Sequence, residues 1–549
     1  MDTTASTTTP LSEEDTKKEE RKVIFASSLG TVFEWYDFYL YATLAPFFAA
    51  LFFPPGNDTA ALLSAFATYA AGFLVRPFGA LVFGHLGDLM GRKYTFLVTI
   101  LVMGISTAAV GFLPTYASIG WAAPVILVTL RLLQGLALGG EYGGAATYVA
   151  EHAQPNKRGY ATSWIQTTAT AGFFLSLLVI GCSRTFIEEA EFKEWGWRLP
   201  FMVSIILLLF SLYIRMKLNE SPIFKRIKSE GKASKSPLRD SFFKYPNNKF
   251  VLLALLGATA GQGVIWYTGQ FYALFFLTIT LKVDFVTAYL LVGISLLIAT
   301  PFFIVFGGLS DKIGRLRIIL LGCLIGAFTY IPLFHGLTHF VNPSLESYRE
   351  KTHVSVAAND CGFHIFVLPG TKFTKCDKVK DFLTKAGLDF KVLPGEEGST
   401  VVTHIGDEVI SETDNGDKLD DAPYKAALEK TGYPAKFNKD DLQWIPTLAI
   451  LTVLVLFVTM VYGPIAAYLV EMFPTNIRYT SMSLPYHIGN GWFGGMLPLV
   501  ATAMVAASGN IYQGLWYPIV VALMTVVIGG LFLKETVGAG YFHKDSHDH

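Results

Sequence analysis

The stretch GHLGDLMGRK, residues 84–93, separates two long apolar segments and predicts a short turn at a membrane surface. Its glycines allow a tight bend and a close approach to a neighbouring segment. Its charged side chains place opposite charges at the water boundary. The residues concerned are Gly84, Gly87, Asp88, Gly91, Arg92 and Lys93.

The same pattern returns in GGLSDKIGR, residues 307–315, again between two apolar segments. A repeat at matching places in two sets of apolar segments indicates two halves related by duplication. The matched pairs are Gly84 and Gly307, Asp88 and Asp311, Gly91 and Gly314, and Arg92 and Arg315.

The composition is that of a membrane protein. Of the 549 residues, 52% are hydrophobic and 16% are charged, against about 25% charged in soluble domains. The mean hydropathy is +0.43. The 43 basic residues balance 43 acidic ones, so net charge indicates neither a nucleic-acid partner nor an acidic one.

Twelve apolar runs are long enough to cross about 30 Å of hydrocarbon as helices. They predict an all-α polytopic membrane protein with six spans in each half. The runs are 23–52, 60–84, 94–113, 121–150, 160–182, 197–217, 249–280, 286–308, 316–338, 445–471, 480–508 and 512–534.

Basic residues fall in turns on one side of these runs, which predicts that both termini and the central loop are cytoplasmic. The expected organisation has seven parts. These are a disordered tail at 1–22, an N-terminal bundle at 23–217, a linker at 218–248, helices seven to nine at 249–339, an outer insert at 340–444, helices ten to twelve at 445–534, and a tail at 535–549.

The insert at 340–444 is rich in Lys, Asp, Glu and Gly and predicts a small α+β domain outside the membrane. Residues 377–386 and 422–431 have helical spacing, whereas 389–393 and 400–411 alternate as strands do. Cys361 and Cys376 both lie here, and a disulfide is favoured over two free thiols if the compartment is oxidising. No histidine spacing suggests a metal site, and no cofactor motif or GxxxxGK[ST] loop occurs.

Three acidic residues inside predicted spans are candidates for proton coupling, because a buried ionisable group is costly and usually functional. Glu34 and Asp37 lie one turn apart in the first span, and Glu141 lies in the fourth. Two carboxylates close together in low dielectric favour protonation of one of them. The alternative is that they neutralise a fixed arginine and only hold helices together.

The candidates for substrate binding include two intramembrane arginines, Arg76 and Arg131, whose planar forks suit a carboxylate. Arg76 could also be a counter-ion to Glu34 or Asp37, and Arg131 could form a carboxylate clamp. The other candidates are polar or aromatic residues at helical spacing in the same spans or in the second half: Tyr41, Gln134, Trp266, Tyr267, Gln270, His487 and Asn490.

Glu471 and Arg478 lie at the end of the tenth span and predict a gating ion pair. With the glycine-rich stretches they form the expected gating set: Gly84, Asp88, Gly91, Arg92, Asp311, Arg315, Glu471 and Arg478.

The two glycine-rich stretches resemble the signature turns of the major facilitator superfamily. FEWYDFYLYA, FLVRPFGALVFGHLGD, RLLQGLALGGEYGG, NESPIF and VEMFPTNIRYTSMSLPY resemble its metabolite:proton symporter branch, which includes carriers for α-ketoglutarate, citrate, shikimate and proline/betaine. The resemblance implies a twelve-helix fold of two six-helix bundles that works by alternating access, with Asp88 at the end of the eleventh helix and paired with Arg92. Leu89 departs from the pattern, which usually has a basic residue there, and so does the insert.

These features predict a secondary transporter, not an enzyme, that takes up a small polar metabolite with protons, an organic acid being favoured. A proline- or betaine-type zwitterion carrier and a sensor reading a ligand through the insert are the alternatives. We expect a monomer in the bacterial inner membrane, surrounded by lipid, with no nucleic-acid partner.

Overall fold

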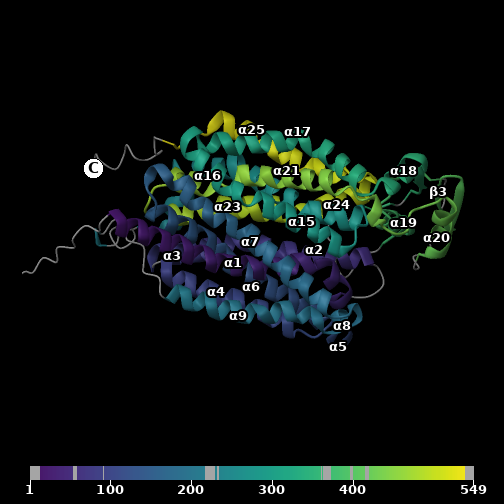
Figure 1. Ribbon diagram of the computed structural model, residues 1–549, viewed down its shortest axis with the longest axis horizontal. Coiled ribbons are helices and arrows are strands. Elements are labelled where there is room, and N and C mark those ends of the chain that lie inside the picture. Colours follow the sequence, from purple (N-terminus) through teal and green to yellow (C-terminus); the bar gives the residue numbers. More distant parts are fainter. Residues whose placement is uncertain are drawn as a thin grey trace, which may run out of the picture.

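The computed structural model describes residues 13–53, 58–90, 92–216, 229–230, 234–359, 361–362, 373–395, 400–413 and 419–537. Long helices run side by side through most of the molecule, and a small domain with a sheet projects from one end (Figure 1). We call that end the insert end. Helix α1 begins and helix α25 ends at the opposite end, which we call the termini end.

The N-terminal bundle contains six spanning units. They are α1 (Glu13–Phe52), α2 (Asp58–Leu74) with α3 (Arg76–Leu89), α4 (Arg92–Phe112), α6 (Ala122–His152), α7 (Arg158–Phe186) and α9 (Leu199–Met216). The short helices α5 (Tyr116–Ile119) and α8 (Glu189–Glu194) lie at the insert end (Figure 1).

The C-terminal bundle repeats this plan after α11 (Pro237–Phe242). Its units are α12 (Asn247–Ala254) continued by η3 (Leu255–Thr259), α13 (Ala260–Tyr267), η4 (Thr268–Tyr272), α14 (Ala273–Phe275) and η5 (Phe276–Thr280); α15 (Phe285–Ala299) with α16 (Pro301–Ile313); α17 (Arg315–Val341); α21 (Trp444–Tyr462) with α22 (Ile465–Met472); α23 (Arg478–Ile488) with η7 (Gly489–Gly495) and α24 (Leu497–Ser508); and α25 (Trp516–Phe532).

The predicted fold class is confirmed. Ten helices among the described residues are long and apolar enough to cross a membrane, and 97–112 is a shorter apolar helix. Prolines divide spans at matching places in the two halves: Pro77 opens α3 and Pro301 opens α16. A proline removes a backbone donor and so is tolerated at the first turn of a helix.

The stretch at 84–93 is mostly helix, so the prediction of a short turn there was wrong in extent. Helix α3 continues to Leu89, and α16 likewise continues to Ile313 before Gly314 adopts a φ of 115°. The close approach occurs at Gly87, where a Cβ would clash with the ring of Tyr479, whereas a Cβ on Gly84 would make an ordinary contact 3.5 Å from Thr480 Cα. Gly91 lies outside the described residues.

The insert is a four-stranded sheet packed with helices. After α18 (Pro343–Lys351) come β1 (Val354–Ala357), α19 (Lys375–Lys385), β2 (Lys391–Leu393), β3 (Thr400–Ile405), β4 (Glu408–Thr413) and α20 (Asp421–Lys430). The strand order is β2-β1-β3-β4. Strands β1 and β2 are parallel, whereas β3 is antiparallel to both of its neighbours.

Sequence reasoning located α19, α20 and β2 but missed α18 and β1. The single strand expected over 400–411 is a hairpin, because Gly406 takes a φ of 59° and reverses the chain.

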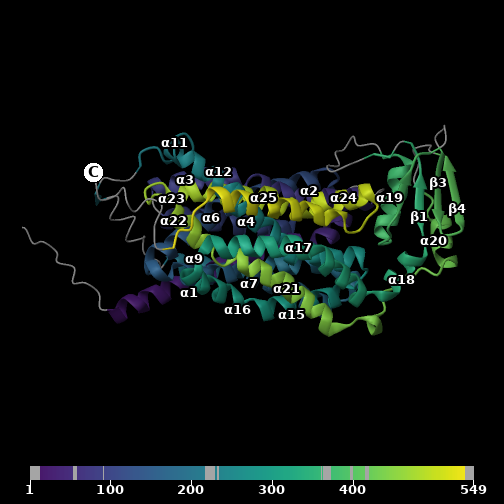
Figure 2. The same ribbon diagram turned by 90° about the horizontal axis from the view of Figure 1, so that it is seen from above.

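The insert is fixed to the C-terminal bundle. Phe390 N donates to Gly509 O at 2.9 Å, and Ile511 N donates to Asp389 Oδ1 at 3.0 Å. Lys439 Nζ lies 3.3 Å from Asp284 Oδ2. Figure 2 shows α19 next to the end of α24, with the sheet beyond it.

Candidate functional site

Arg76 is the first residue of α3 and is 1% exposed. Its guanidinium carbon lies 4.3 Å from the ring centre of Phe38 and 4.1 Å from that of Phe73. A cation over an aromatic face is stabilised by the ring quadrupole. Within the described part of the chain, Arg76 Nε and Nη2 have no hydrogen-bond partner.

Arg131, in α6, is fully buried on the same side of the bundle. Its Nη1 donates to Gln134 Oε1 at 2.6 Å, and Gln134 Nε2 donates to Thr107 Oγ1 at 3.0 Å. Its guanidinium carbon lies 4.4 Å from the Tyr41 ring and 4.8 Å from the Phe38 ring. Nε and Nη2 again lack a partner among the described residues.

Both arginines therefore contact Phe38 and lie close enough to repel each other. In the described ranges, no carboxylate oxygen lies within 4.0 Å of either guanidinium, so neither the counter-ion role of Arg76 nor a carboxylate clamp at Arg131 is visible. Burying an uncompensated charge costs several kcal/mol. Two such charges side by side make a site that an anion would stabilise. The Arg131 guanidinium carbon also lies 5.5 Å from the ring centre of Tyr69. We call Phe38, Tyr41, Tyr69, Phe73, Arg76 and Arg131 the arginine–aromatic cluster.

The C-terminal bundle covers this cluster with aromatic rings. Tyr267, in α13, packs edge-on against Phe73 at 5.4 Å. Trp266 stacks with Tyr39 of α1 at 5.7 Å, and Trp35 lies 6.4 Å from it. The expected residues Tyr41, Arg76, Arg131, Gln134, Trp266 and Tyr267 thus lie in one region at the interface of the bundles.

Three other expected residues lie nearby with different environments. Gln270 Nε2 is 3.5 Å from Thr170 Oγ1 in the N-terminal bundle. Asn490 exchanges two hydrogen bonds of 2.9 Å with Gln262, so its amide is satisfied within its own bundle. His487 is 1% exposed and lies within electrostatic range of Arg76 and close to the backbone of Gly139.

The three acidic candidates are buried inside the N-terminal bundle, at 4% exposure for Glu34, 5% for Asp37 and 2% for Glu141. Asp37 lies within electrostatic range of Glu141 and of the Ser204 hydroxyl on α9. Among the described residues, no cation lies within 4.0 Å of Asp37 and its Oδ1 accepts no hydrogen bond. Two carboxyl groups within electrostatic range of each other in a low-dielectric region are stable when at least one is protonated.

A second set of aromatic residues joins the bundles. The Tyr142 and Tyr486 rings stack with centres 3.6 Å apart and planes 5° apart. Tyr462 Oη lies 2.7 Å from Tyr486 Oη, and Gln166 Nε2 donates to Tyr142 Oη at 2.6 Å. Sequence reasoning missed Tyr142, Gln166 and Tyr462, because such pairings join helices far apart in the chain.

The two signature aspartates join the two bundles at the termini end in equivalent ways. Asp88 Oδ2 accepts from Thr480 N at 3.2 Å and Thr480 Oγ1 at 2.6 Å, at the start of α23. Asp311 accepts from Gly159 N and Tyr160 N, both at 2.8 Å, at the start of α7. Each carboxylate therefore caps a helix of the opposite bundle, where the helix dipole favours negative charge.

Ion pairs surround these caps. Arg315 pairs with Glu471 and, at 3.0 Å, with Asp311. Arg158 of the N-terminal bundle lies 3.6 Å from Glu471. The expected Glu471–Arg478 pairing was wrong in its partners, because Arg478 lies instead against Glu151, at 3.5 Å. The side chain of Arg92 is outside what the structure describes. Arg158 and Glu151 were missed by sequence reasoning.

Comparison with known proteins agrees with this architecture. A family model described as "Sugar (and other) transporter" matches residues 22–241. The chain is 36% identical over 343 residues to the shikimate transporter of Escherichia coli, covering 61% of this chain and 77% of that protein. It is 34% identical to the α-ketoglutarate permease of E. coli (62% and 77% covered) and 36% identical to the E. coli proline/betaine transporter (57% and 64%).

A solved structure of the proton:xylose symporter XylE, an E. coli protein, covers 95% of this chain and 97% of its own, with a TM-score of 0.62 and 16% identity. The fold and the relatives define a multi-pass membrane transporter, not an enzyme. The chain belongs to the major facilitator superfamily and, within it, to the metabolite:proton symporter branch.

Proposed function

We propose that the protein takes up a small organic acid together with protons by alternating access. The observation that carries this proposal is the pair of buried arginines, Arg76 and Arg131, with unpaired N–H groups and no carboxylate within 4.0 Å in the described part of the chain. A substrate carboxylate would accept hydrogen bonds from one guanidinium in a bidentate manner. A second carboxylate or a hydroxyl would meet the other guanidinium.

Coupling to protons would use Glu34, Asp37 and Glu141. Asp37 and Glu141 lie in the same bundle as the two arginines and on the same helices, α1 and α6, that carry part of the arginine–aromatic cluster. Protonation of this acidic pair and occupation of the arginines by an anion each change the net charge buried at the interface. A bound proton or substrate drives a conformational change only if it binds the two states with different affinity.

The gate at the termini end would open in the opposite half of the cycle. The Asp88–Thr480 and Asp311–Gly159 contacts, and the Arg158–Glu471 pair, all join the two bundles. They must break together when the bundles rock apart at this end. The basic residues near these turns favour a cytoplasmic location for the termini end, in the inner membrane of a bacterium, with a single chain as the transporting unit.

A second candidate is transport of a zwitterion such as proline or a betaine. The stacked rings of Trp35, Tyr39 and Trp266 favour it, because aromatic faces bind quaternary ammonium groups. One arginine would then hold the carboxylate and the rings would hold the cation.

Uptake into proteoliposomes tests both candidates. An inwardly directed proton gradient should accelerate uptake of a labelled dicarboxylate or hydroxy acid, and an uncoupler should abolish the acceleration. Competition by unlabelled organic acids but not by betaine or proline supports the first candidate, and the reverse supports the second. Uptake that is unchanged by the pH gradient and by the uncoupler would contradict proton coupling.

A further inference from the structure

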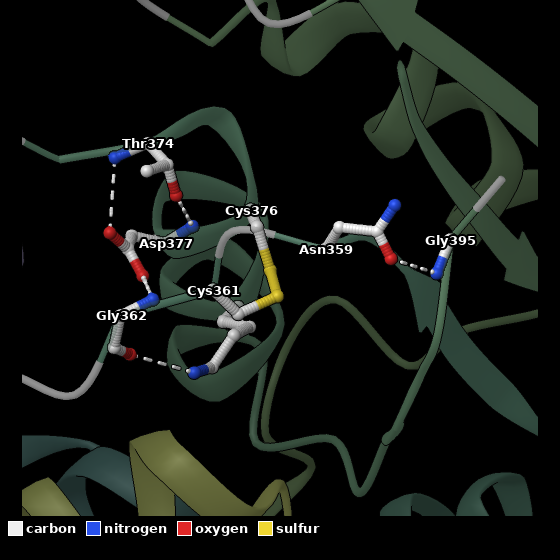
Figure 3. Close-up of a disulfide and its surroundings, with 8 residues drawn as sticks. Asn359, Cys361, Gly362, Thr374, Cys376, Asp377 and Gly395 are labelled. Carbon is white, nitrogen blue, oxygen red and sulfur yellow. Dashed lines mark hydrogen bonds between the residues drawn. A yellow bond between two sulfur atoms is a disulfide. The ribbon is translucent and has the colours of Figure 1, made fainter. Parts of the chain in front are cut away.

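The disulfide of the insert occupies a distinctive place in its topology. Cys361 follows β1, and Cys376 is in the first turn of α19, the helix that leads from β1 to the parallel strand β2 (Figure 3). Thioredoxin-type redox motifs place a C-x-x-C pair near a β–α–β unit; this pair shares the β–α–β setting, but only Cys376 lies in the first turn of the helix. Here the two cysteines are 15 positions apart in sequence, with Cα atoms 5.2 Å apart.

The two sulfur atoms differ in access. Cys376 is fully buried, whereas Cys361 is half-buried. An external thiolate must reach the sulfur that it attacks, so only Cys361 can be the point of attack. Cys376 is then the leaving group.

The surroundings of Cys376 suit a leaving thiolate. It is the second residue of an 11-residue helix whose first turn is held by a capping box between Thr374 and Asp377. A helix N-terminus lowers the pKa of a cysteine thiol because its free N–H groups and dipole favour negative charge. Lys380 adds a cation, with its Nζ donating to Gly362 O at 3.3 Å, next to Cys361.

Asp377 opposes this effect with its own negative charge. Its two carboxylate oxygens accept from Thr374 N at 3.0 Å and Gly362 N at 2.7 Å, as Figure 3 shows. These hydrogen bonds spread the charge over backbone donors. The carboxylate also bonds Gly362 and thereby positions the segment that carries Cys361.

We propose that the insert is a thiol–disulfide exchange module in which Cys361 is the attacked sulfur and Cys376 the leaving thiolate. The co-reactant is a dithiol, on a peptide or a small molecule. One thiolate of the dithiol bonds to Cys361 Sγ as the Cys361–Cys376 bond breaks, and Cys376 takes up a proton. The second thiol of the dithiol then forms its own disulfide and releases Cys361 as a thiol. Two electrons and two protons pass from the dithiol to the insert.

The module is attached to the C-terminal bundle. Helix α19 packs against η5 and α24 of the C-terminal bundle. Exchange at Cys361 is nevertheless a property of the insert alone and does not depend on which substrate the helices carry.

The first test measures exchange in the full-length protein in detergent, in a C182S background because Cys182 is an exposed free thiol. The protein is incubated in buffers of reduced and oxidised glutathione, alkylated, and analysed by the mass of the peptides containing Cys361 and Cys376. We expect reversible reduction and reoxidation without loss of the folded state, monitored by thermal unfolding. A pair that is reduced only after denaturation is a structural cross-link, and this result would overturn the proposal.

The second test traps the intermediate. The C376S variant should form a mixed disulfide with glutathione at Cys361, and the C361S variant should do so at least roughly tenfold more slowly because Cys376 is buried. Equal trapping in two folded variants would contradict the assigned roles.

If either variant unfolds, the rate of glutathione exchange is measured instead in the D377N variant, which keeps both cysteines. Loss of the charge next to Cys376 should speed glutathione exchange, by roughly threefold for each unit by which the thiol pKa falls, and K380Q should slow it.

Discussion

Asp88 in the N-terminal bundle accepts two hydrogen bonds from Thr480 in the C-terminal bundle, through the backbone N–H at 3.2 Å and the hydroxyl at 2.6 Å. Asp311 of the C-terminal bundle makes the equivalent contact, because it accepts hydrogen bonds from the backbone N–H groups of Gly159 and Tyr160 at the start of α7. The duplicated stretches thus place one carboxylate in each half at the N-terminus of a helix in the other half. We propose that this exchange of caps stabilises the state in which the bundles meet at the termini end.

Replacing Asp88 by Asn should shift the equilibrium toward opening at the termini end. A hydrogen bond to a charged group is worth about 1.5–3 kcal/mol, which corresponds to a roughly 10- to 100-fold change in the ratio of the two states. A cysteine placed at the buried Ser483 should then react faster with a maleimide. D311N, at the equivalent position, should have the same direction of effect, and unchanged labelling in both variants would contradict the gating role.

Replacing Arg76 or Arg131 by Lys should reduce uptake at least roughly tenfold, since an ammonium cannot supply a planar fork or stack on the rings of Phe38 and Phe73 in the same way. The matched control is R317K, at an exposed arginine of the termini end. Labelled uptake at several substrate concentrations separates binding from turnover. Near-normal uptake by R76K and R131K would remove the central support for an anionic substrate.

Replacing Asp37 by Asn should separate transport from its driving force. A neutral amide mimics the protonated acid, so exchange of labelled for unlabelled substrate across the membrane should continue while uphill accumulation driven by a pH gradient is lost. E141Q and E34Q, compared in the same two assays, identify which of the acids is needed. Accumulation that persists in all three variants would show that the proton is carried elsewhere.

The pH dependence of stability should carry a signature of Lys282, which lies in the turn between η5 and α15 and has a φ of 61°. Burial, and secondarily the charge of Lys385, lower the pKa of Lys282 to about 8 from 10.5. The unfolded chain therefore binds more protons between these values, and stability rises with pH across that window. K282M should raise the unfolding free energy at neutral pH by up to about 3 kcal/mol, and this gain should fade as the pH rises from about 8 to 10.5. A gain that is constant with pH would mean that only packing has changed.

The spans were predictable because a bilayer demands long apolar runs, and the runs ending at 308 and 471 differ from the observed ends at Ile313 and Met472 by a few residues. The pair Arg76 and Arg131 was predictable as well, since charge inside such a run stands out. The ion-pair and hydrogen-bond partners of the buried side chains were not predictable. Arg158 meets Glu471, and Gln166 meets Tyr142 beside Tyr486, only after two distant helices have packed, and local spacing does not encode which helices meet.

Removal of the insert tests whether the chain is a transporter or a sensor. The ends of the insert are adjacent, because Gln443 N donates to Phe340 O at 2.9 Å, so a short glycine-containing turn can replace residues 344–441 while keeping Asn342. Asn342 should be retained because it donates to Leu281 O at 2.9 Å and so fixes the end of α17. The two bundles meet through contacts outside the insert, such as Trp266 with Tyr39 and Asp88 with Thr480. We therefore expect the shortened chain to fold and to take up substrate at a rate similar to that of the full chain. Correct membrane insertion with complete loss of uptake would instead make the insert part of the transport mechanism, and loss of a ligand response in a chain with no measurable flux would favour the sensor.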